Sequence, residues 1–245
     1  MSQPGRFVWV NPGEALPSPE QALAEPDGLL AAGADLSAAR LIEAYRQGIY
    51  PWYAEGQPVL WWSPNPRMVL YLEEFRMHRS LQKTARRMRA ERMWTLTIDR
   101  DFAGVIRACR APRDEHGGTW INDDIVTAYL ELHHQGLAHS VELWHGSGAR
   151  ALLAGGLYGV SLGRMFYGES MFAKVNDASK IALAGLVTTL RNEGFRMLDC
   201  QQNTRHLASL GARAISRTSF LEELAVLIEQ PGPDWSTLHV DLPAS

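Results

Sequence analysis

Two short segments place polar side chains within otherwise apolar stretches. In the segment "MLDCQ", Asp199 and Gln201 are two residues apart. Side chains alternate between the two faces of a strand, so we expect Asp199 and Gln201 on one face and Leu198 and Cys200 on the other. A carboxylate beside an amide can hold an amine and help to remove its proton. The spacing alone, however, favours a structural role for Asp199, as a cap or an ion-pair partner at the strand end.

A second carboxylate, Glu169, lies in "MFYGESMF". Burying a lone charge is costly, so this side chain must be solvated at an edge, paired, or functional. The neighbouring Ser170 is not predicted to be a nucleophile, because Phe172 occupies the second glycine position of the G-x-S-x-G elbow.

Other patterns that resemble catalytic or binding motifs fail on inspection. Cys200 with His206 six residues later suggests a thiol acyltransferase, but a cysteine in an apolar strand is more often inert packing. The histidines between residues 133 and 145 lack a metal-ligand spacing such as HExxH. The glycine-rich "AGGLYGVSLG" has neither G-x-G-x-x-G nor a GK[ST] ending. We therefore predict no metal site and no phosphate-binding loop.

Composition sets the broad class of the protein. The chain has 245 residues, of which 46% are hydrophobic and 21% charged, which is ordinary for one large or two small globular domains. No apolar run is long enough for a membrane span, and "MSQPGRFVWV" lacks a signal-peptide core, so we expect a cytoplasmic protein without membrane contact. Two distant cysteines, Cys109 and Cys200, argue against a disulfide framework and a thiolate zinc site.

The basic residues are concentrated in one place. Seven of them lie between Arg76 and Arg92, against the single acid Glu91. On a helix, five fall within an arc of about 100°: Arg76, Arg79, Lys83, Arg86 and Arg87. Four apolar residues gather on the opposite side: Met77, Leu81, Ala85 and Met88. A solvated helix face and a contact to a phosphate backbone explain this stripe about equally well.

The elements that must position these residues follow from periodicity and from turn residues. Residues 28–47 contain a helix capped by Asp35 or Ser37 and ended by Gly48. The stretch "GIYPWYAEGQPVLWWSPNPR", with three tryptophans and four prolines, is predicted to be a loop. Near Pro66 the composition changes, which places a domain boundary there.

Beyond the boundary, helices and strands are mixed. "RMVLYL" and "MWTLTID" are predicted strands on either side of the basic helix, and residues 123–135 form an amphipathic helix. "HSVELW", "RALLAGGLYGVSL" and "GRMFYGESMF" predict an antiparallel meander. A helix from Asn176 or Asp177 to Gly194, the strand "RMLDCQ" and a helix over residues 219–229 complete the chain. This order predicts an α+β fold with a mixed sheet flanked by helices.

The motifs taken together resemble one family, the bacterial leucyl/phenylalanyl-tRNA–protein transferases. The resemblance rests on "GLLAAGADLS", "GIYPWY", "LWWSPNPR", "GTWI", "AHSVELW", "GGLYGV", "FYGESMF", "ASK", "LDCQ" and "HLASLGA", in this order between Gly28 and about Phe220. It implies a small N-terminal domain over residues 1–66, with the aromatic loop, and a GNAT-like acyltransferase domain over residues 67–245. It also implies transfer of Leu or Phe, and less readily Met, from Leu-tRNA or Phe-tRNA to proteins with an N-terminal Arg or Lys, which marks them for degradation as an N-degron.

The resemblance also assigns residues to roles. It places three aromatic residues at the 3′-terminal adenosine of the tRNA: Tyr45, Trp52 and Trp120. It forms the aminoacyl pocket from five apolar residues: Leu157, Phe166, Met171, Leu183 and Leu198. Tyr129 is a further residue near the substrate, and the basic stripe becomes the tRNA-backbone contact. Trp61 and Trp62 receive no chemical role.

The implied reaction needs no cofactor, because the ester of the aminoacyl-tRNA is already activated. The resemblance implies that Gln201 accepts a hydrogen bond from the attacking amine and that Asp199 polarises Gln201. Glu169 would orient the donor or seat the cationic acceptor, with Asp199 as a second carboxylate for it.

Two other functions are compatible with parts of the sequence. An acyl-CoA-dependent N-acyltransferase would need an R/Q-x-x-G-x-G/A loop before its helix, and "FAKVNDASK" has none. A non-enzymatic RNA-binding protein would explain the basic helix and the aromatic residues, but would leave "GESMF" and "LDCQ" without a role.

Overall fold

Two mixed β-sheets organise the chain in the computed structural model, which describes residues 7–111 and 119–244. The first six residues, on which the prediction of no signal peptide partly rests, and Gly118 of "GTWI" lie outside the described residues. The α+β class predicted from the sequence is confirmed. None of the helices within the described ranges has the length and apolar character needed to cross a membrane.

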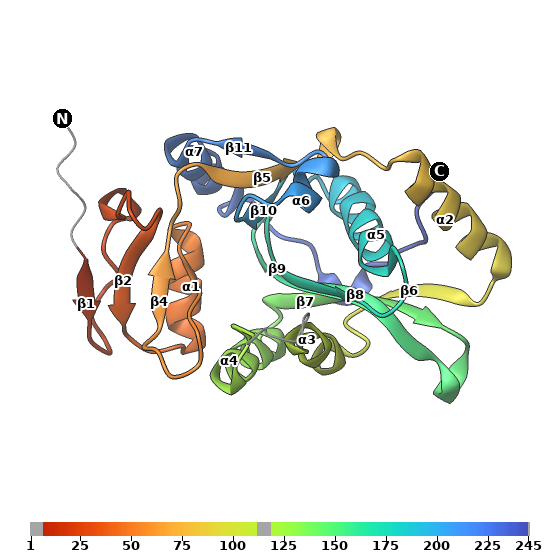
Figure 1. Cartoon of the computed structure of the whole chain (residues 1–245), viewed down its shortest axis with the longest axis horizontal. Helices are drawn as coiled ribbons and strands as arrows, with labels where there is room; N and C mark the ends of the chain where they lie inside the picture. Colours follow the sequence, from red (N-terminus) through yellow and green to blue (C-terminus); the bar gives the residue numbers. More distant parts are fainter. Residues whose placement is uncertain (1–6, 112–118, 245) are drawn as a thin grey trace.

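The smaller sheet comes from the N-terminal part of the chain. Its four strands, in spatial order, are β1 (Val8–Val10), β2 (Leu29–Gly33), β4 (Leu60–Trp62) and β3 (Tyr50–Pro51). Strands β1 and β2 are parallel, and the other pairs are antiparallel. Helix α1 (Ala38–Arg46) packs beside this sheet (Figure 1). It begins after Ser37, as predicted, and the Ser37 hydroxyl accepts a hydrogen bond from the Arg40 amide at 3.3 Å.

The prediction that the proline- and tryptophan-rich stretch is a loop is wrong for Tyr50–Pro51, which is strand β3, and for Leu60–Trp62. The second segment is strand β4, which pairs with β2 on one side and β3 on the other. Proline removes a backbone donor, so it is excluded from central strands but tolerated at edges. Pro51 lies in the edge strand β3 and the other prolines of the stretch lie outside β4, so the ladder of β4 loses no donor.

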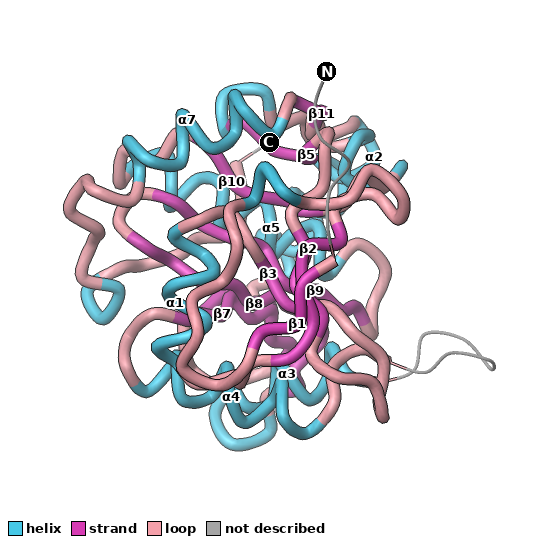
Figure 2. The backbone as a smooth tube through the Cα atoms, turned by 90° about the vertical axis from the view of Figure 1, so that its left-hand side faces the viewer, coloured by secondary structure: helices cyan, strands magenta, loops and turns pink. Residues whose placement is uncertain are grey.

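The larger sheet has seven strands. In spatial order they are β11 (Arg213–Ile215), β5 (Arg67–Tyr71), β10 (Met197–Gln201), β9 (Met165–Ala173), β8 (Leu152–Leu162), β7 (Ala138–His145) and β6 (Trp94–Ile98). Only the pair of β10 and β9 is parallel within this sheet. The meander of β7, β8 and β9 is confirmed. Figure 2 shows the small sheet in front of β7, β8 and β9 when the chain is viewed from the N-terminal strands.

Helices cover both faces of the larger sheet (Figure 1). Helices α2 (Arg79–Glu91) and α5 (Ala178–Asn192) lie on one face, and α3 (Phe102–Arg110) and α4 (Asp123–His134) lie on the other. The short α6 (Arg205–Ser209) and α7 (Arg217–Leu227) follow β10 and β11. Along β5, Met68 and Leu70 join the apolar cluster under α2 and α5, whereas Val69 joins the cluster shared with α3, α4 and the small sheet.

Helix α2 forms where the sequence predicts it. Leu81, Ala85 and Met88 are buried against the sheet, and the basic residues of the helix are exposed. Arg76 is a correction, because it precedes the helix, which begins at Arg79. The helix ends at Arg92, whose backbone adopts a left-handed conformation with φ of 51°.

Helices α3 and α6 were not predicted from the sequence. Helix α3 begins at Asp101, whose carboxylate accepts a hydrogen bond from the Gly104 amide at 2.9 Å. An aspartate before an apolar run is a usual helix start, so the signal was present in the sequence. The helix covers the sheet on the side opposite α2.

The two adjacent tryptophans of β4 should differ in their effect on stability. Trp61 is fully buried and donates from Nε1 to the Gly33 carbonyl at 3.0 Å, whereas Trp62 is partly exposed. Trp61→Ala should lower the free energy of unfolding by about 3 to 5 kcal/mol, because it leaves a large cavity. Trp62→Ala should lower the free energy of unfolding by less than half of that amount. Urea unfolding followed by circular dichroism measures both, and equal losses would contradict this account of the smaller sheet.

Candidate functional site

A cavity of about 410 Å³ opens on the α5 side of the larger sheet. Its walls come from β8, β9, β10, α5 and the segment after β10. All five residues predicted for the aminoacyl pocket line it: Leu157, Phe166, Met171, Leu183 and Leu198. Further apolar lining residues were not predicted: Leu70, Leu186 and Leu207. The apolar walls therefore gather residues from Leu70 to Leu207, which lie far apart in the sequence.

The cavity forms where the parallel strands β9 and β10 part. Their ladder pairs Leu198 with Phe166 and Asp199 with Tyr167, and goes no further. On its other side, β9 pairs Gly168 and Ser170 with consecutive residues of β8, so Glu169 is the extra residue of a β-bulge. A bulge bends the strand and redirects the side chain at that position. Glu169 thus reaches the cavity lining.

A second bulge lies on β10, between Asp199 and Gln201. Gln201 has φ of 60°, a left-handed conformation that few residues other than glycine adopt. The prediction that Asp199 and Gln201 share one face is therefore wrong, because the bulge breaks the alternation of side chains. Leu198, Cys200 and Gln201 line the cavity, and Asp199 faces away from it.

Asp199 is completely buried and pairs with Arg67 at the start of β5. Arg67 donates from Nε to Oδ1 at 2.8 Å and from Nη2 to Oδ2 at 2.6 Å. Oδ1 also accepts the backbone amide of Gln201 at 2.8 Å. Asp199 therefore holds the unusual backbone of Gln201 in place, and its contact to Gln201 is through the backbone.

Arg67 is itself enclosed. Its guanidinium carbon lies 4.8 Å from the ring centre of Tyr50 and 4.6 Å from that of Phe220, and Nη1 donates to the Gly48 carbonyl at 3.1 Å. In the sequence, Arg67 ends the motif "LWWSPNPR", and no role for it is predicted there. Burial of an aspartate is costly without a cationic partner. The apolar surroundings of Asp199 in the sequence could therefore have prompted a search for a partner such as Arg67.

Glu169 is the centre of a hydrogen-bond network. Its Oε1 accepts from the Tyr45 hydroxyl at 2.7 Å and from Gln201 Nε2 at 2.8 Å. Its Oε2 accepts from the Tyr129 hydroxyl at 3.0 Å. The two tyrosine hydroxyls also contact each other. Tyr45 comes from α1, Tyr129 from α4 and Glu169 from β9, so elements beside both sheets meet at this carboxylate.

The electrostatics of Glu169 are unusual for a carboxylate. Burial, with a smaller contribution from the charge of Asp199, raises the pKa of Glu169 to about 7. The hydrogen bonds from Tyr45 and Tyr129 and the charge of Arg67 act in the opposite direction. Glu169 is thus poised to gain or lose a proton near neutral pH.

The aromatic residues predicted for the tRNA end fall into two groups. Trp52 and Trp120 line the cavity, and Trp52 is 39% exposed. Trp62 contacts Trp52 edge-on at 5.6 Å between ring centres and donates from Nε1 to the Trp52 carbonyl at 2.6 Å. Tyr45 is fully buried and does not line the cavity, so its ring offers no open face for stacking in this structure.

Two other chemistries find no support at the site. Cys200 lines the cavity, but burial raises the pKa of its thiol, which opposes thiolate chemistry. Burial lowers the pKa of His206, also in the lining. Within residues 7–111 and 119–244, no three His, Cys, Asp or Glu side chains are grouped so that they could hold a metal ion.

Comparisons with known proteins agree on one family. A family model described as "Leucyl/phenylalanyl-tRNA protein transferase" matches residues 69–225, and its companion for the N-terminal domain matches residues 34–65. A leucyl/phenylalanyl-tRNA–protein transferase of Paraburkholderia phytofirmans is 53% identical over 97% of this chain and 99% of its own length. A protein of the same name from Burkholderia orbicola is 53% identical over 93% of this chain and 89% of its own.

Among solved structures, the similarity is distant. The structure of L-PGS from Bacillus licheniformis has a TM-score of 0.41 and 10% identity, over 82% of this chain and 72% of that one. A similarity of this degree does not establish a shared fold, so the GNAT-like domain stays a prediction.

The raised pKa of Glu169 predicts a pH-dependent stability. The folded pKa of about 7 lies above the ordinary value of 4.5, so this carboxyl's contribution to stability is present below about pH 4.5 and is lost as the pH rises towards 7. Between about pH 5 and pH 8, the free energy of unfolding should fall by roughly 2 to 3 kcal/mol more in the unmodified protein than in Glu169→Gln.

Urea unfolding at a series of pH values measures this difference. Glu55→Gln, which changes an exposed carboxylate, is the matched control and should keep the pH dependence of the unmodified protein. Parallel stability curves for Glu169→Gln and the unmodified protein would contradict the raised pKa.

Proposed function

The chain belongs to the leucyl/phenylalanyl-tRNA–protein transferase family, and we propose that it transfers Leu or Phe, and less readily Met, to the N-terminal Arg or Lys of acceptor proteins. Membership makes the chain an aminoacyltransferase that uses aminoacyl-tRNA as donor and a protein as acceptor. The identity of the amino acids transferred and of the acceptor N-terminus is the proposal.

The apolar cavity carries this proposal. Its five predicted lining residues are buried or partly buried hydrophobic side chains, with Glu169 and Gln201 at one wall. A pocket of this kind suits an uncharged side chain such as Leu, Phe or Met. Met171 is unbranched and flexible, so it can adjust to an aliphatic or an aromatic occupant. A β-branched side chain is rejected only by shape, which discriminates modestly.

Trp52 and Trp120 are proposed to bind the 3′-terminal adenosine of the donor. Both lie in the cavity lining, and stacking of a base on an aromatic ring contributes about 1 to 3 kcal/mol. The contacts from Trp62 hold Trp52 in place before the donor arrives. We propose that Tyr45 does not stack on the adenosine, and that its hydroxyl group orients Glu169.

The reacting groups follow from the hydrogen bonds. Gln201 donates from Nε2 to Glu169, which leaves its amide oxygen on the other side to accept a hydrogen bond from the attacking amine. Arg67 occupies both oxygens of Asp199, so Glu169 is the carboxylate left to face a cationic acceptor. Asp199 would then support Gln201 through its backbone amide and not by contact with the substrate.

In the reaction the amine nitrogen attacks the ester carbonyl carbon. A new C–N bond forms, the C–O bond to the terminal ribose breaks, and the ribose oxygen leaves with a proton. The acceptor's ammonium must first lose a proton, and a carboxylate with a pKa of about 7 can receive it near neutral pH. Proximity of amine and ester supplies much of the remaining acceleration.

The basic stripe is proposed to contact the tRNA backbone. Arg79, Lys83, Arg86 and Arg87 are exposed on α2, and Arg76 is exposed just before it. Within the described residues, Arg87 is the one member of the stripe with an ion pair, which it forms with Glu91 at 3.6 Å. Exposed cations in a row attract a phosphate backbone.

Further proposals concern organisation and cellular role. A small domain over residues 1–66 and a GNAT-like domain over residues 67–245 are supported by the division of the two sheets between Trp62 and Arg67. We place the protein in the cytoplasm, where aminoacyl-tRNA is available. The added residue would mark the product for degradation through an N-degron.

A transfer assay tests the proposed function. The protein, incubated with Leu-tRNA or Phe-tRNA and a peptide that begins with Arg, should add one residue to the peptide, as read by mass spectrometry. A peptide that begins with Glu should remain unchanged, because Glu169 would repel it. No extension while the donor ester stays intact would reject the assignment.

Replacement of Trp52 tests the stacking role. Trp52→Ala should raise KM for aminoacyl-tRNA by about 5-fold to 100-fold, which corresponds to the loss of one stacked base. The matched control is Trp9→Ala, which removes an even more exposed tryptophan, on β1 and outside the cavity lining. If both variants keep the KM of the unmodified protein, adenosine does not stack on Trp52.

A further inference from the structure

The end of the larger sheet farthest from the small sheet carries an exposed row of side chains. Trp94 on β6 pairs with His145 on β7, and His145 pairs with Leu152 on β8. Residues paired in this way point to the same face of the sheet. Leu152 is 68% exposed, and the rings of Trp94 and His145 lie 4.4 Å apart. This row lies on the α2 and α5 face, because Trp94 packs against the same cluster as Leu96.

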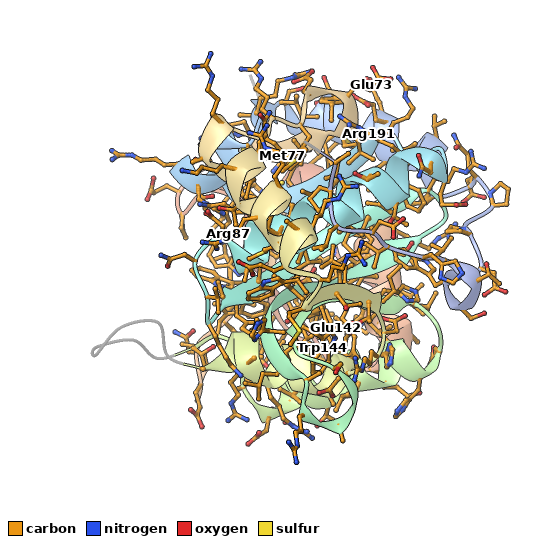
Figure 3. All side chains as sticks on the ribbon, turned by 90° about the vertical axis from the view of Figure 1, so that its right-hand side faces the viewer. Glu73, Met77, Arg87, Glu142, Trp144 and Arg191 are labelled. Carbon is orange, nitrogen blue, oxygen red and sulfur yellow. The ribbon has the colours of Figure 1, made fainter. Side chains whose placement is uncertain are left out.

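Cations surround the row. Arg89 and Arg92 are exposed at the end of α2, and Arg150 is exposed in the turn between β7 and β8. The turn is tied to the end of α2, because Gly146 donates its amide to the Met93 carbonyl at 2.8 Å. Met93 is itself 47% exposed. Figure 3 shows this side of the molecule, with Arg87 on α2 above the hairpin that carries Glu142 and Trp144.

The acidic side chains near this surface are already engaged. Asp177, between β9 and α5, pairs with Lys180 at 2.8 Å and accepts a hydrogen bond from the Thr84 hydroxyl at 3.1 Å. Glu91 accepts a hydrogen bond from Trp94 Nε1 at 2.5 Å and pairs with Arg87 at 3.6 Å. The segment from His145 to Leu152 contains no acidic residue. The charge of the region is therefore strongly positive, although the chain as a whole has a net charge of −3.

The row and the cavity lie on the same face of the sheet, with the start of α5 between them, where Ala178 packs against Gly155 of β8. Leu157, in the cavity lining, lies five residues from Leu152, which is a path of roughly 17 Å along a strand. Lys174 is exposed in the loop between β9 and α5, where its amide donates to the Ala154 carbonyl at 2.8 Å and its ammonium lies 5.9 Å from the ring centre of Phe172. A chain that leaves the cavity in this direction must pass over this loop, around the start of α5, before it reaches Leu152.

We propose that this end of the sheet binds the donor tRNA where its single-stranded 3′ end joins the paired acceptor stem. The inference rests on the proposed function. The surface, which we call the hairpin-end surface, consists of seven residues: Arg89, Arg92, Met93, His145, Arg150, Leu152 and Lys174. It extends the basic stripe of α2 towards the cavity, so one RNA molecule can contact the stripe, the hairpin-end surface and the cavity together.

The chemistry of the surface favours RNA over a protein partner. Arg150 and Lys174 can neutralise phosphates, and the exposed Leu152 and Met93 can pack against sugars and bases. The proposed acceptor carries a positive N-terminus, which the same cations would repel. An acidic protein could still bind here, and the experiment below separates the two.

Two donors of different length distinguish this surface from the cavity. One is Leu-tRNA, and the other is the leucyl ester of adenosine, which reaches only the cavity and its tryptophans. The double variant Arg150→Ala/Lys174→Ala and the variant Leu152→Ser should each raise KM for Leu-tRNA by about 3-fold to 10-fold, with KM for the short donor unchanged. The salt slope of tRNA binding should fall by roughly 1 to 2 in the double variant.

The control is Arg107→Ala, which removes an exposed cation from α3 on the opposite side of the sheet and should leave both donors unaffected. Binding of uncharged tRNA, followed by fluorescence anisotropy, gives a readout that does not depend on transfer. An unchanged affinity in both surface variants overturns the inference. A raised KM for the acceptor protein alone also overturns it and indicates protein docking. Failure of the unmodified protein to use either donor is a separate result that rejects the proposed function.

Discussion

The buried ion pair of Arg67 and Asp199 is the constraint on which the site depends. Two charges removed from water are tolerated only when their geometry and remaining hydrogen bonds are good. Here both conditions hold, because the pair is bidentate, Gly48 and the Gln201 amide take further bonds, and two aromatic rings flank the guanidinium. The pair joins β5 to β10 at the bulge of β10, and so fixes the position of Gln201.

The same pair contributes to the electrostatics of the cavity. Asp199 raises the pKa of Glu169 and Arg67 lowers it, while burial makes the largest contribution. These two charges act in opposite directions at Glu169, and the hydrogen bonds from Tyr45 and Tyr129, which lower the pKa, have a larger effect than either charge. A charged pair outside the cavity lining thus acts on two side chains that belong to it, on Gln201 through its backbone and on Glu169 through the electrostatic field.

Sequence periodicity predicts much of this architecture but not its irregular points. The meander, α2, α5 and β10 follow from alternation, helical spacing and capping residues, which are local signals. The bulges at Glu169 and at Asp199/Gln201 depend on how neighbouring strands pair, and Arg67 is 132 residues from its partner in the chain. The family resemblance predicted five apolar residues of the cavity. The contact of Tyr45 with Glu169 depends on how α1 packs against α4, which no local sequence pattern indicates.

The network around Glu169 has a consequence for synthesis of the chain. Tyr45 and Glu169 are 124 residues apart, and their hydrogen bond crosses from α1 to β9. Contacts of such separation form late, because a long loop must close before they contribute. A nascent chain that has emerged only as far as β8 has Trp52 and Trp120 but neither Glu169 nor Gln201. The ribosome also consumes aminoacyl-tRNA, and under the proposed mechanism an incomplete chain at its exit lacks the groups needed to use that substrate.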